Sequence, residues 1–502
     1  MIRDGIAHLA AREGLSVVPD EGLVAEVAGL VEWPVPLLAR IDGTFMDLPP
    51  EVMRTTMRVN QRYFSLTHAD GTPAPFFAVV ANIEAPDGGA AIAAGNERVL
   101  RARLSDARFF WDQDRKQKLE DFLPKLETVV FHAKLGTQGE RVRRLERLAG
   151  IIAPMVGADV ALAQRAARLA KADLASGMVG EFPELQGVMG RYYAQHGGED
   201  ARVAEAIGAH YRPLGPGDAV PNEPVAIAVA LADKLDQLVG FFVVGERPKG
   251  SGDPFALRRS ALGVMRLIRE NSIRVPLKTL YAESLLGFEP KTFGDLKGLG
   301  LDPNWRDAAE DLISNSVAGT RKSWLTEAID DFIAFVMDRL RVQLRSQGAR
   351  HDVIAASFGK SGDDDLLRLL ARADALKGLV ESDTGANLLT AYRRAANILR
   401  IEDKKDGPHT GPVDASLLEA PEEKALAAAL DRAEPAATEA LGTEHFAAAM
   451  EALAHLRAPV DAFFDRVTVN AAQPELRKNR LRLLSRLRAA MDAVADFSKI
   501  EG

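Results

Sequence analysis

The chain has 502 residues, 47% of them hydrophobic and 27% charged, which is ordinary globular usage and excludes a mainly disordered chain. With 63 Lys and Arg against 71 Asp and Glu, the net charge of −8 excludes a protein that is basic all over, although it leaves room for local basic patches. No cysteine is present, which excludes disulfide frameworks, cysteine-bound zinc, iron–sulfur clusters and thiol nucleophiles.

The sequence shows neither a signal-peptide pattern at its start nor an uninterrupted apolar span. Its most apolar stretch, residues 225–244, is interrupted by Asp233, Lys234 and Asp236 before it reaches the roughly 20 apolar residues that a membrane-spanning helix needs. Together with the absence of cysteine, this predicts a soluble protein of the cytoplasm.

Helix and strand patterns alternate over the first 135 residues. Apolar residues recur at helical spacing over 24–31, and Trp33-Pro34 is predicted to end that helix, because proline disfavours the α conformation in the preceding residue. Residues 37–41, 63–67 and 76–80 read as strands. The prediction for this part is an α+β fold.

The rest of the chain reads as helix nearly throughout, with breaks at proline and glycine clusters such as 213–217 and 298–300. A long helix is predicted from Trp324 to Gln347, a polar surface loop over 402–421, and alanine-rich helices from there to the end. The expected fold is mainly α and multidomain, with an α+β domain at 1–135, a helical domain at 136–320 and a second helical domain at 321–502.

The most basic segment is 477–488, which holds six cations and no acid. Leu484, Leu487, Met491 and Val494 fall at the spacing of a buried helix face. Like charges four residues apart destabilise a helix by a few tenths of a kcal/mol unless anions offset them. Either a polyanion or the acidic helices upstream could do so, and both interpretations stay open. The phosphate-binding candidates here are Arg477, Lys478, Arg480, Arg482 and Arg486.

A second basic cluster lies on a predicted helix whose buried face is formed by Leu100, Leu104, Ala107 and Trp111. Nearby aspartates dilute its positive field, so structural salt bridges and phosphate contacts fit the pattern equally. The candidates in this cluster are Arg98, Arg101, Arg103, Arg115 and Lys116.

The glycine-rich segment 249–259 is predicted to start a helix, with Asp253 as its cap and Pro254 as its first residue. A helix start can bind an anion, and Arg258 and Arg259 would stand beside it. A helix capped by its own aspartate, with two arginines pointing outward, explains the same pattern.

Several catalytic patterns are absent from the sequence. Gly359-Lys360-Ser361 mimics the end of a phosphate-binding loop, but Ile354 stands where that motif needs glycine. No Gly-x-Ser-x-Gly, His-Glu-x-x-His or dinucleotide-binding pattern occurs. His351-Asp352 has no further histidine nearby, and Asp233 with Asp236 lacks a third ligand or a nucleophile. We therefore expect no catalytic residues and no metal on this chain.

Strings along almost the whole chain, in their order and spacing, resemble the beta subunit of the bacterial heterotetrameric glycyl-tRNA synthetase. They include 30–34, 60–64, 95–100, 186–190, 232–236, 252–259, 397–399 and 463–465. The resemblance implies two alpha and two beta chains. The alpha chain would activate glycine with ATP and Mg²⁺, and the beta chain would bind and position tRNA(Gly), with no membrane or DNA partner.

The same resemblance implies what each helical domain looks like. The middle domain is similar to the His-Asp (HD) phosphohydrolases, and the carboxyl-terminal domain is similar to the helical, DALR-type anticodon-binding domain of arginyl-tRNA synthetase. By that similarity, the basic segment 477–488 becomes an anticodon-side candidate, while the cations at 98–116 and 258–259 become candidates for the tRNA body.

The sequence departs from these patterns in two places. Where a phosphohydrolase has its metal-binding His-Asp pair, this chain reads Lys171-Ala172-Asp173, with Asp233 as the candidate for the last metal-binding aspartate. Losing an imidazole ligand disfavours the alternative function, metal-dependent phosphate hydrolysis. In addition, family members carry a substantial region before the segment that begins here, so we expect this chain to lack it.

Overall fold

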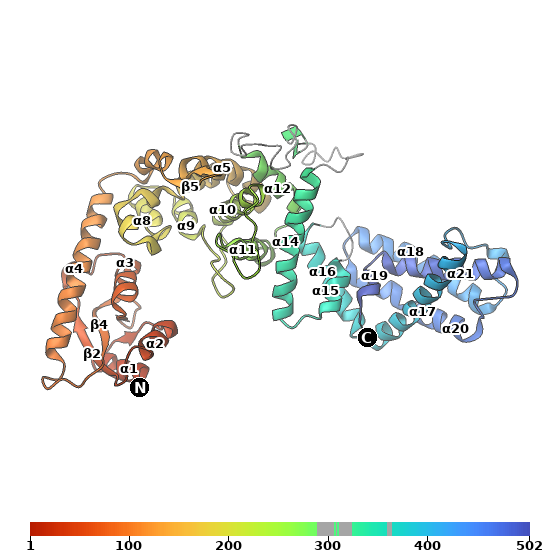
Figure 1. Cartoon of the computed structure of the whole chain (residues 1–502), viewed down its shortest axis with the longest axis horizontal. Coiled ribbons are helices and arrows are strands. Elements are labelled where there is room, and N and C mark those ends of the chain that lie inside the picture. The colour runs from red at the N-terminus through yellow and green to blue at the C-terminus, as the bar shows by residue number, and fades with distance from the viewer. Residues whose placement is uncertain (289–305, 308, 311–323, 359–363, 502) are drawn as a thin grey trace. The chain divides into compact units, whose positions relative to one another are not determined.

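The computed structural model describes residues 1–288, 306–307, 309–310, 324–358 and 364–501 (Figure 1). The chain forms two compact units: unit 1 comprises Met1–Arg247 and Glu283–Gly300, and unit 2 comprises Pro248–Ala282 and Leu301–Gly502. Among the described residues, no helix is both long enough and apolar enough to cross a membrane.

Unit 1 opens with a four-stranded antiparallel sheet in the order β1-β3-β4-β2. The central strand β4 pairs with β2 from Val35↔Ala81 to Arg40↔Phe76. The elements of this part are α1 (Ile2–Arg12), β1 (Ser16–Val17), α2 (Glu21–Ala28), β2 (Val35–Arg40), α3 (Pro50–Thr55), β3 (Phe64–Thr67), β4 (Pro73–Ala81) and α4 (Ala90–Asp114). The predicted α+β character is confirmed.

Helices α1 and α2 share one apolar core with strands β3 and β4. Ile6, Leu23, Phe64 and Ala78 are at most 2% exposed in it. Helix α2 ends at Ala28 with Gly29 as its cap, earlier than the predicted end at Trp33-Pro34. Gly29 keeps right-handed backbone angles (φ −78°, ψ −12°), and because glycine is a weak helix former the helix can end before Trp33-Pro34.

The remainder of unit 1 is a helical bundle around α10. Its elements are β5 (Val130–His132), β6 (Gly136–Thr137), α5 (Gln138–Ile152), α6 (Val160–Leu169), α7 (Gly177–Glu181), α8 (Val188–His196), α9 (Ala201–Ala209) and α10 (Pro224–Val243). Helix α10 contacts α5, α6 and α9 and has 17 buried residues among its 20. A helix that is apolar on all sides belongs in a core, so any charge on α10 needs an internal partner.

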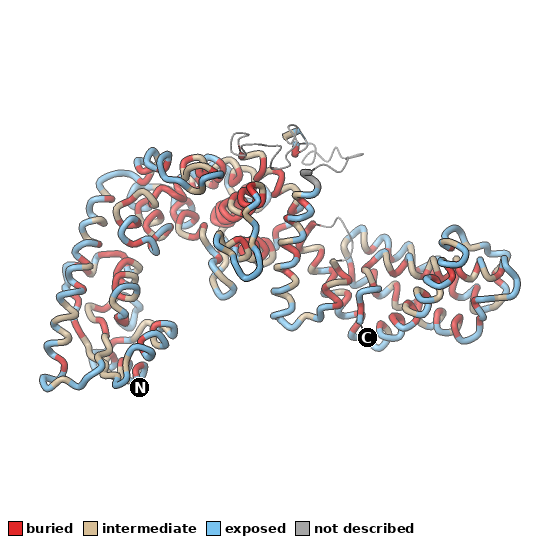
Figure 2. Tube along the Cα trace, in the orientation of Figure 1, coloured by how far each residue is buried: buried red, intermediate tan, exposed pale blue. Residues whose placement is uncertain are grey.

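Unit 2 is built from helices. Their bounds are α11 (Leu257–Glu270), α14 (Trp324–Ser346), α15 (His351–Phe358), α16 (Leu366–Val380), α17 (Asp383–Asp406), α18 (Pro421–Gly442), α19 (Phe446–Ala454), α20 (Arg457–Arg466) and α21 (Pro474–Asp492), while α12 (Leu277–Leu286) crosses from unit 2 into unit 1. Buried residues of α15 to α21 form one core, and buried and exposed positions alternate along each helix in Figure 2.

The predictions for unit 2 can be compared with its helices. The long helix expected over 324–347 is α14. The polar loop expected over 402–421 starts later, because α17 continues to Asp406 and ends where Gly407 takes a φ of +83°. His351 and Asp352 begin α15. The break expected at 298–300 lies outside the described residues, and the three predicted domain ranges stay a prediction.

Candidate nucleic-acid interface

Helix α21 presents one apolar side to the core of unit 2. Leu484, Leu487, Met491 and the following Val494 are all 0% exposed, at the positions that the spacing predicted. The helix packs against α17 and α18. Its cations therefore emerge along the edges of these two helices, and their partners decide which of them remain available to a ligand.

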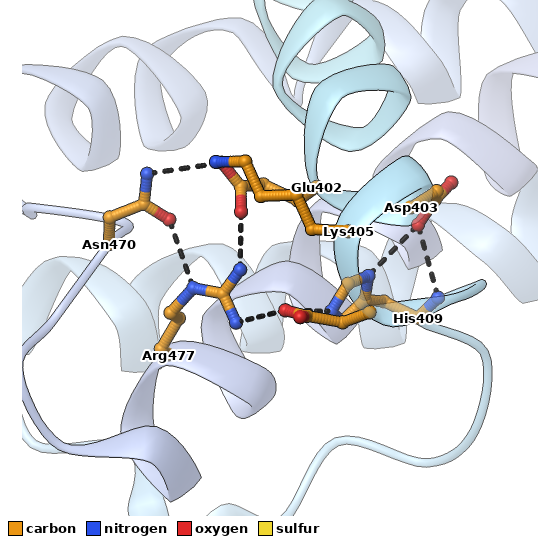
Figure 3. Close-up of polar contacts among 7 residues, drawn as sticks. Glu402, Asp403, Lys405, His409, Asn470 and Arg477 are labelled. Atoms are coloured by element: carbon orange, nitrogen blue, oxygen red, sulfur yellow. Dashed lines mark hydrogen bonds and ion pairs between the residues drawn. The ribbon is translucent and has the colours of Figure 1, made fainter.

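Arg477 is bonded to α17 (Figure 3). Its guanidinium pairs with Glu402, and Nη1 lies 2.5 Å from Oδ2 of Asp406. Lys405 Nζ donates to Glu402 Oε1 at 2.9 Å. Hydrogen bonds from Lys405 and Arg477 lower the pKa of Glu402 to about 2, so this carboxylate stays ionised at neutral pH. Arg477 thus fastens α21 to α17.

Arg480 and Arg486 are bonded to α18 in the same way. Arg480 pairs with Glu423, whose side chain is 0% exposed, and donates to the Thr468 carbonyl at 2.9 Å. Arg486 donates to Glu434 at 2.7 and 2.8 Å and to Asp431 at 2.7 Å. Three of the five predicted cations are therefore neutralised by carboxylates of the upstream acidic helices.

Lys478 and Arg482 differ from those three arginines. Lys478 is exposed and has no ion pair with any described residue. Arg482 is half-buried and donates to the Pro412 carbonyl at 3.3 Å. It makes no direct ion pair with a described residue, although its charge, after the hydrogen bonds from Ser416, helps to lower the pKa of Asp414. Four residues apart, the two side chains share one side of α21. They keep the positive charge that α21 can offer to a phosphate.

Helix α4 carries the second predicted cluster, and its expected buried face is confirmed: Leu100, Leu104, Ala107 and Trp111 are at most 7% exposed. Two cations beside this face, Arg101 and Arg103, make only long ion pairs. The Arg101–Asp42 and Arg103–Glu181 separations are 3.7 and 3.9 Å, between largely exposed side chains that contribute little to stability.

The other three cations of this cluster make no direct ion pair with a described carboxylate, although the charge of Arg115, after that of Arg108, contributes to lowering the pKa of Asp47. Arg98 is exposed, Arg115 lies over the Trp111 ring at 4.8 Å, and Lys116 bonds to Gln113 at 2.9 Å. Unlike Arg477, Arg480 and Arg486 of α21, Arg98 and Lys116 are held by no carboxylate of the described residues.

The start of α11 corrects the prediction for Asp253 and Pro254. The helix begins at Leu257, after Ala256 at φ +54°, so Pro254 is not its first residue. The left-handed turn at Ala256 lets the Asp253 carboxylate reach forward and accept from the N–H groups of Leu257 and Arg258 at 2.8 and 3.0 Å. The helix start is therefore already occupied by an anionic group of the chain itself.

The two predicted arginines of α11 also differ from each other. Arg258 folds back to the carbonyls of Gly250 and Gly252, at 2.6 and 3.3 Å. Arg259 is exposed. Only Arg259 projects freely from this helix start.

Unit 1 buries a cluster of five charges: Asp233 and Asp236 on α10, Arg141 and Arg144 on α5, and Lys171, two residues after the end of α6. Asp233 Oδ1 lies 2.8 Å from Lys171 Nζ and 3.0 Å from Arg141 Nη2. Asp236 lies 3.3 Å from Arg141 Nε and 2.6 Å from Arg144 Nε. None of these side chains is more than 8% exposed. The charges that interrupt the apolar sequence of α10 are thus paired inside the core.

His210 completes this cluster as a neutral imidazole. Burial lowers the pKa of His210 to about 3. Its Nε2 lies 2.8 Å from Lys171 Nζ and its Nδ1 lies 2.6 Å from the Ile207 carbonyl. These contacts fit Nδ1–H as the donor to the carbonyl and Nε2 as the acceptor from the ammonium.

The positions that correspond to the metal ligands of the phosphohydrolases are used differently here. Asp233 is bonded to two cations of the chain, and Asp173 Oδ2 accepts from the backbone N–H groups of Gly187 and Gly190 at 2.6 and 2.9 Å. Across the described ranges, no group of three His, Cys, Asp or Glu side chains could hold a metal ion. The structure gives no support to the alternative of a metal-dependent phosphohydrolase.

Comparison with known families decides the identity of the fold. Residues 1–359 match the family model described as the glycyl-tRNA synthetase beta subunit. The chain belongs to this family. A second model, the DALR anticodon-binding domain, matches residues 388–500, the bundle of α17 to α21. The resemblance to the beta subunit and that of the carboxyl-terminal domain to the DALR type are confirmed, and the family is one of aminoacyl-tRNA synthetases. The similarity of the middle domain to the His-Asp phosphohydrolases stays a prediction.

Individual members of the glycyl-tRNA synthetase beta-subunit family are close in sequence. The glycine–tRNA ligase beta subunits of Rhodospirillum centenum and Phenylobacterium zucineum are each 52% identical over 100% of this chain, and that of Paracoccus denitrificans is 48% identical over 100%. The chain spans 66 to 68% of the length of these three relatives, about two thirds.

Sequence reasoning missed two groups of residues in this family member. The partners of Asp233 and Asp236 could have been sought at Arg141 and Arg144, since both pairs are spaced three apart and would match across two packed helices. The outward side of α17 was also missed, although its cations recur at helical spacing. The sequence left open whether the basic segment meets a polyanion or the acidic helices upstream, and it did not show that Arg477, Arg480 and Arg486 are the cations that pair with carboxylates 50 to 75 residues away.

Proposed function

We propose that this chain binds tRNA(Gly) and holds it for glycylation by an alpha subunit. The observation that carries the proposal is the pair of family matches, which covers 1–359 and 388–500 and joins a synthetase beta-subunit body to an anticodon-binding domain. The relatives that match over this chain are themselves beta subunits of glycine–tRNA ligase.

The chemistry of glycylation is assigned to the partner. ATP, Mg²⁺ and glycine would be bound by the alpha subunit, and none of them is assigned to this chain. The contribution of this chain is positional, because fixing the tRNA body and anticodon sets where the terminal adenosine meets the glycyl-adenylate. Orientation of this kind can lower a reaction barrier by several kcal/mol without any proton transfer. The reducing cytoplasm fits the absence of cysteine.

The proposed RNA contacts on α21 are Lys478 and Arg482, the two predicted cations that make no direct ion pair with any described carboxylate. Arg477, Arg480 and Arg486 are assigned the structural role of holding α21 against α17 and α18. For the tRNA body, the proposed contacts are Arg98, Arg101, Arg103, Arg115, Lys116 and Arg259, with Arg258 bonded to its own loop.

The test is a titration of the full chain with labelled tRNA(Gly) and with a non-cognate tRNA, followed by anisotropy at several salt concentrations. We expect preference for tRNA(Gly), and equal affinity for both tRNAs would contradict the assignment of tRNA(Gly) as the ligand. In Lys478→Ala/Arg482→Ala, two phosphate contacts fewer should make the log–log salt slope shallower by about 1.4. The matched control is Lys424→Ala/Arg432→Ala, which removes two exposed cations of α18.

A further inference from the structure

Helix α17 has an exposed, outward side to which the proposed function assigns no ligand. Arg394, Asn397, Ile401 and Lys404 are spaced by three, four and three residues, so they form one stripe along the helix. Arg400 stands beside this stripe. All five side chains are exposed, whereas Tyr392, Ala395, Leu399 and Glu402 are buried on the opposite side of the helix.

The stripe is positive and holds no acid. Arg400 and Lys404 make no ion pair or hydrogen bond with any residue that the structure describes. Arg394 lies over the Phe464 ring at 4.5 Å and donates to the Phe464 carbonyl at 3.4 Å, neither of which cancels its charge. The acids closest in sequence are engaged elsewhere: Glu402 with Arg477 and Lys405, and Asp403 with His409.

Between these cations lie one apolar side chain, Ile401, and one amide, Asn397. Ile401 is 47% exposed and sits between Arg400 and Lys404 in the sequence and beside both on the helix. Asn397, one turn away, offers an amide that can both donate and accept hydrogen bonds. An exposed β-branched side chain among unpaired cations gains nothing for the folded chain alone, and the two like charges four apart cost it a few tenths of a kcal/mol.

An unpaired RNA strand matches this combination. Its phosphates would meet Arg394, Arg400 and Lys404, a base face would cover Ile401, and a base edge would bond to Asn397. Charge complementarity indicates the ligand. A stripe with three unneutralised cations favours a polyanion. A second copy of this chain is less favoured, because each copy carries a net charge of −8.

We propose that this outward side of α17 binds an unpaired RNA strand through Arg394, Asn397, Arg400, Ile401 and Lys404. The inference rests on the proposed tRNA-binding function and deepens it, because it places a second RNA contact in the domain that α21 shares. It assigns the strand to a helix face on which Arg400 and Lys404 make no ion pair or hydrogen bond with any described residue, whereas Arg477, Arg480 and Arg486 of α21 are bonded to neighbouring helices.

The test compares three variants of the full chain, each first checked for unchanged thermal unfolding. The probes are labelled tRNA(Gly) and a labelled single-stranded RNA of about ten nucleotides and mixed sequence, titrated across a series of salt concentrations. Arg400→Ala/Lys404→Ala should make the log–log salt slope shallower by about 1.4 for both probes. Ile401→Ser should weaken binding severalfold at unchanged slope, because it removes a base contact and no charge. Lys424→Ala/Arg432→Ala on α18 should match the wild type.

The outcomes separate this proposal from the function on which it rests. If the wild type binds tRNA(Gly) and the α17 variants bind it with wild-type slope and affinity, the α17 site is wrong and the tRNA-binding function stands. If the control variant loses as much slope as the α17 variant, the effect is one of overall charge and the site is again wrong. If the wild type binds neither probe, both proposals fail.

Discussion

The cations of α5 and those of α17 lie in opposite surroundings. In unit 1, Arg141 and Arg144 are at most 8% exposed and are bonded to Asp233 and Asp236. In unit 2, Arg400 and Lys404 are exposed and have no partner among the described residues. Similar residue types at similar helical spacing thus serve the core in one helix and remain available to a ligand in the other. Burial and partner, and not residue type, distinguish a structural cation from a binding one.

The buried cluster offers the largest expected effect. In Arg144→Met, Asp236 loses two hydrogen bonds, of 2.6 and 3.2 Å, and keeps only the 3.3 Å contact with Arg141. Removing one partner of a buried ion pair leaves a charge without compensation, so the free energy of unfolding should fall by about 3 kcal/mol. Chemical denaturation followed by circular dichroism measures it.

A double variant sharpens this prediction. Arg144→Met/Asp236→Leu removes both charges and should recover part of the lost stability, because no unpaired carboxylate remains. A loss below about 1 kcal/mol in the single variant would show that these charges are solvated, and the contrast between α5 and α17 would then fail.

Helix α21 contains both a cation that is paired with a buried carboxylate, Arg480, and an exposed cation without an ion pair, Lys478. Comparing these two residues gives the second prediction. Arg480→Ala leaves Oε1 of Glu423 buried without a partner, since only Oε2 is held, by the N–H groups of Glu419 and Ala420. The free energy of unfolding should fall by about 2 kcal/mol. Lys478→Ala, two residues earlier and exposed, should change it by less than about 0.5 kcal/mol.

In RNA binding, the variant with the larger effect should be Lys478→Ala, whereas in stability it is Arg480→Ala. The salt slope for tRNA should become shallower in Lys478→Ala and, at a temperature where both variants are folded, stay unchanged in Arg480→Ala. Equal slopes in the two variants would mean that ion pairing within unit 2 does not decide which cations contact RNA.

The sequence predicted the fold better than it predicted the site. Helix spacing placed the buried faces of α4 and α21 correctly, because periodicity reports directly which side meets a core. It could not tell Arg480 from Lys478, because the partner of Arg480 is Glu423, 57 residues away. It also misplaced the start of α11, where a positive φ at Ala256 overrides the usual order of cap and first helical residue. Contacts between distant segments decide the site, and local pattern does not contain them.

The smallest expected effect is a pH dependence that comes from His210. Burial holds its pKa at about 3 in the folded chain, against 6.5 for the ordinary group. Between these two values the unfolded chain binds a proton that the folded chain does not, so the stability is fully present above pH 6.5 and is lost as the pH falls. One pH unit below 6.5, this group should lower the free energy of unfolding by about 1 kcal/mol.

His210→Gln isolates that contribution from other titrating groups. The glutamine amide oxygen can accept from Lys171 as the imidazole Nε2 does, yet it does not titrate. Denaturation of both proteins from pH 7.5 to 5.0 should show the wild type losing stability more steeply than the variant. Parallel curves would mean that water reaches the imidazole, and the Lys171–Asp233 pair beside it would then be solvated as well. The charges of α5 and α10 would in that case be solvated like those on the outward side of α17. The carboxylate partners of Arg141 and Arg144, and not their burial, would then have to distinguish them from the cations for which we propose RNA binding.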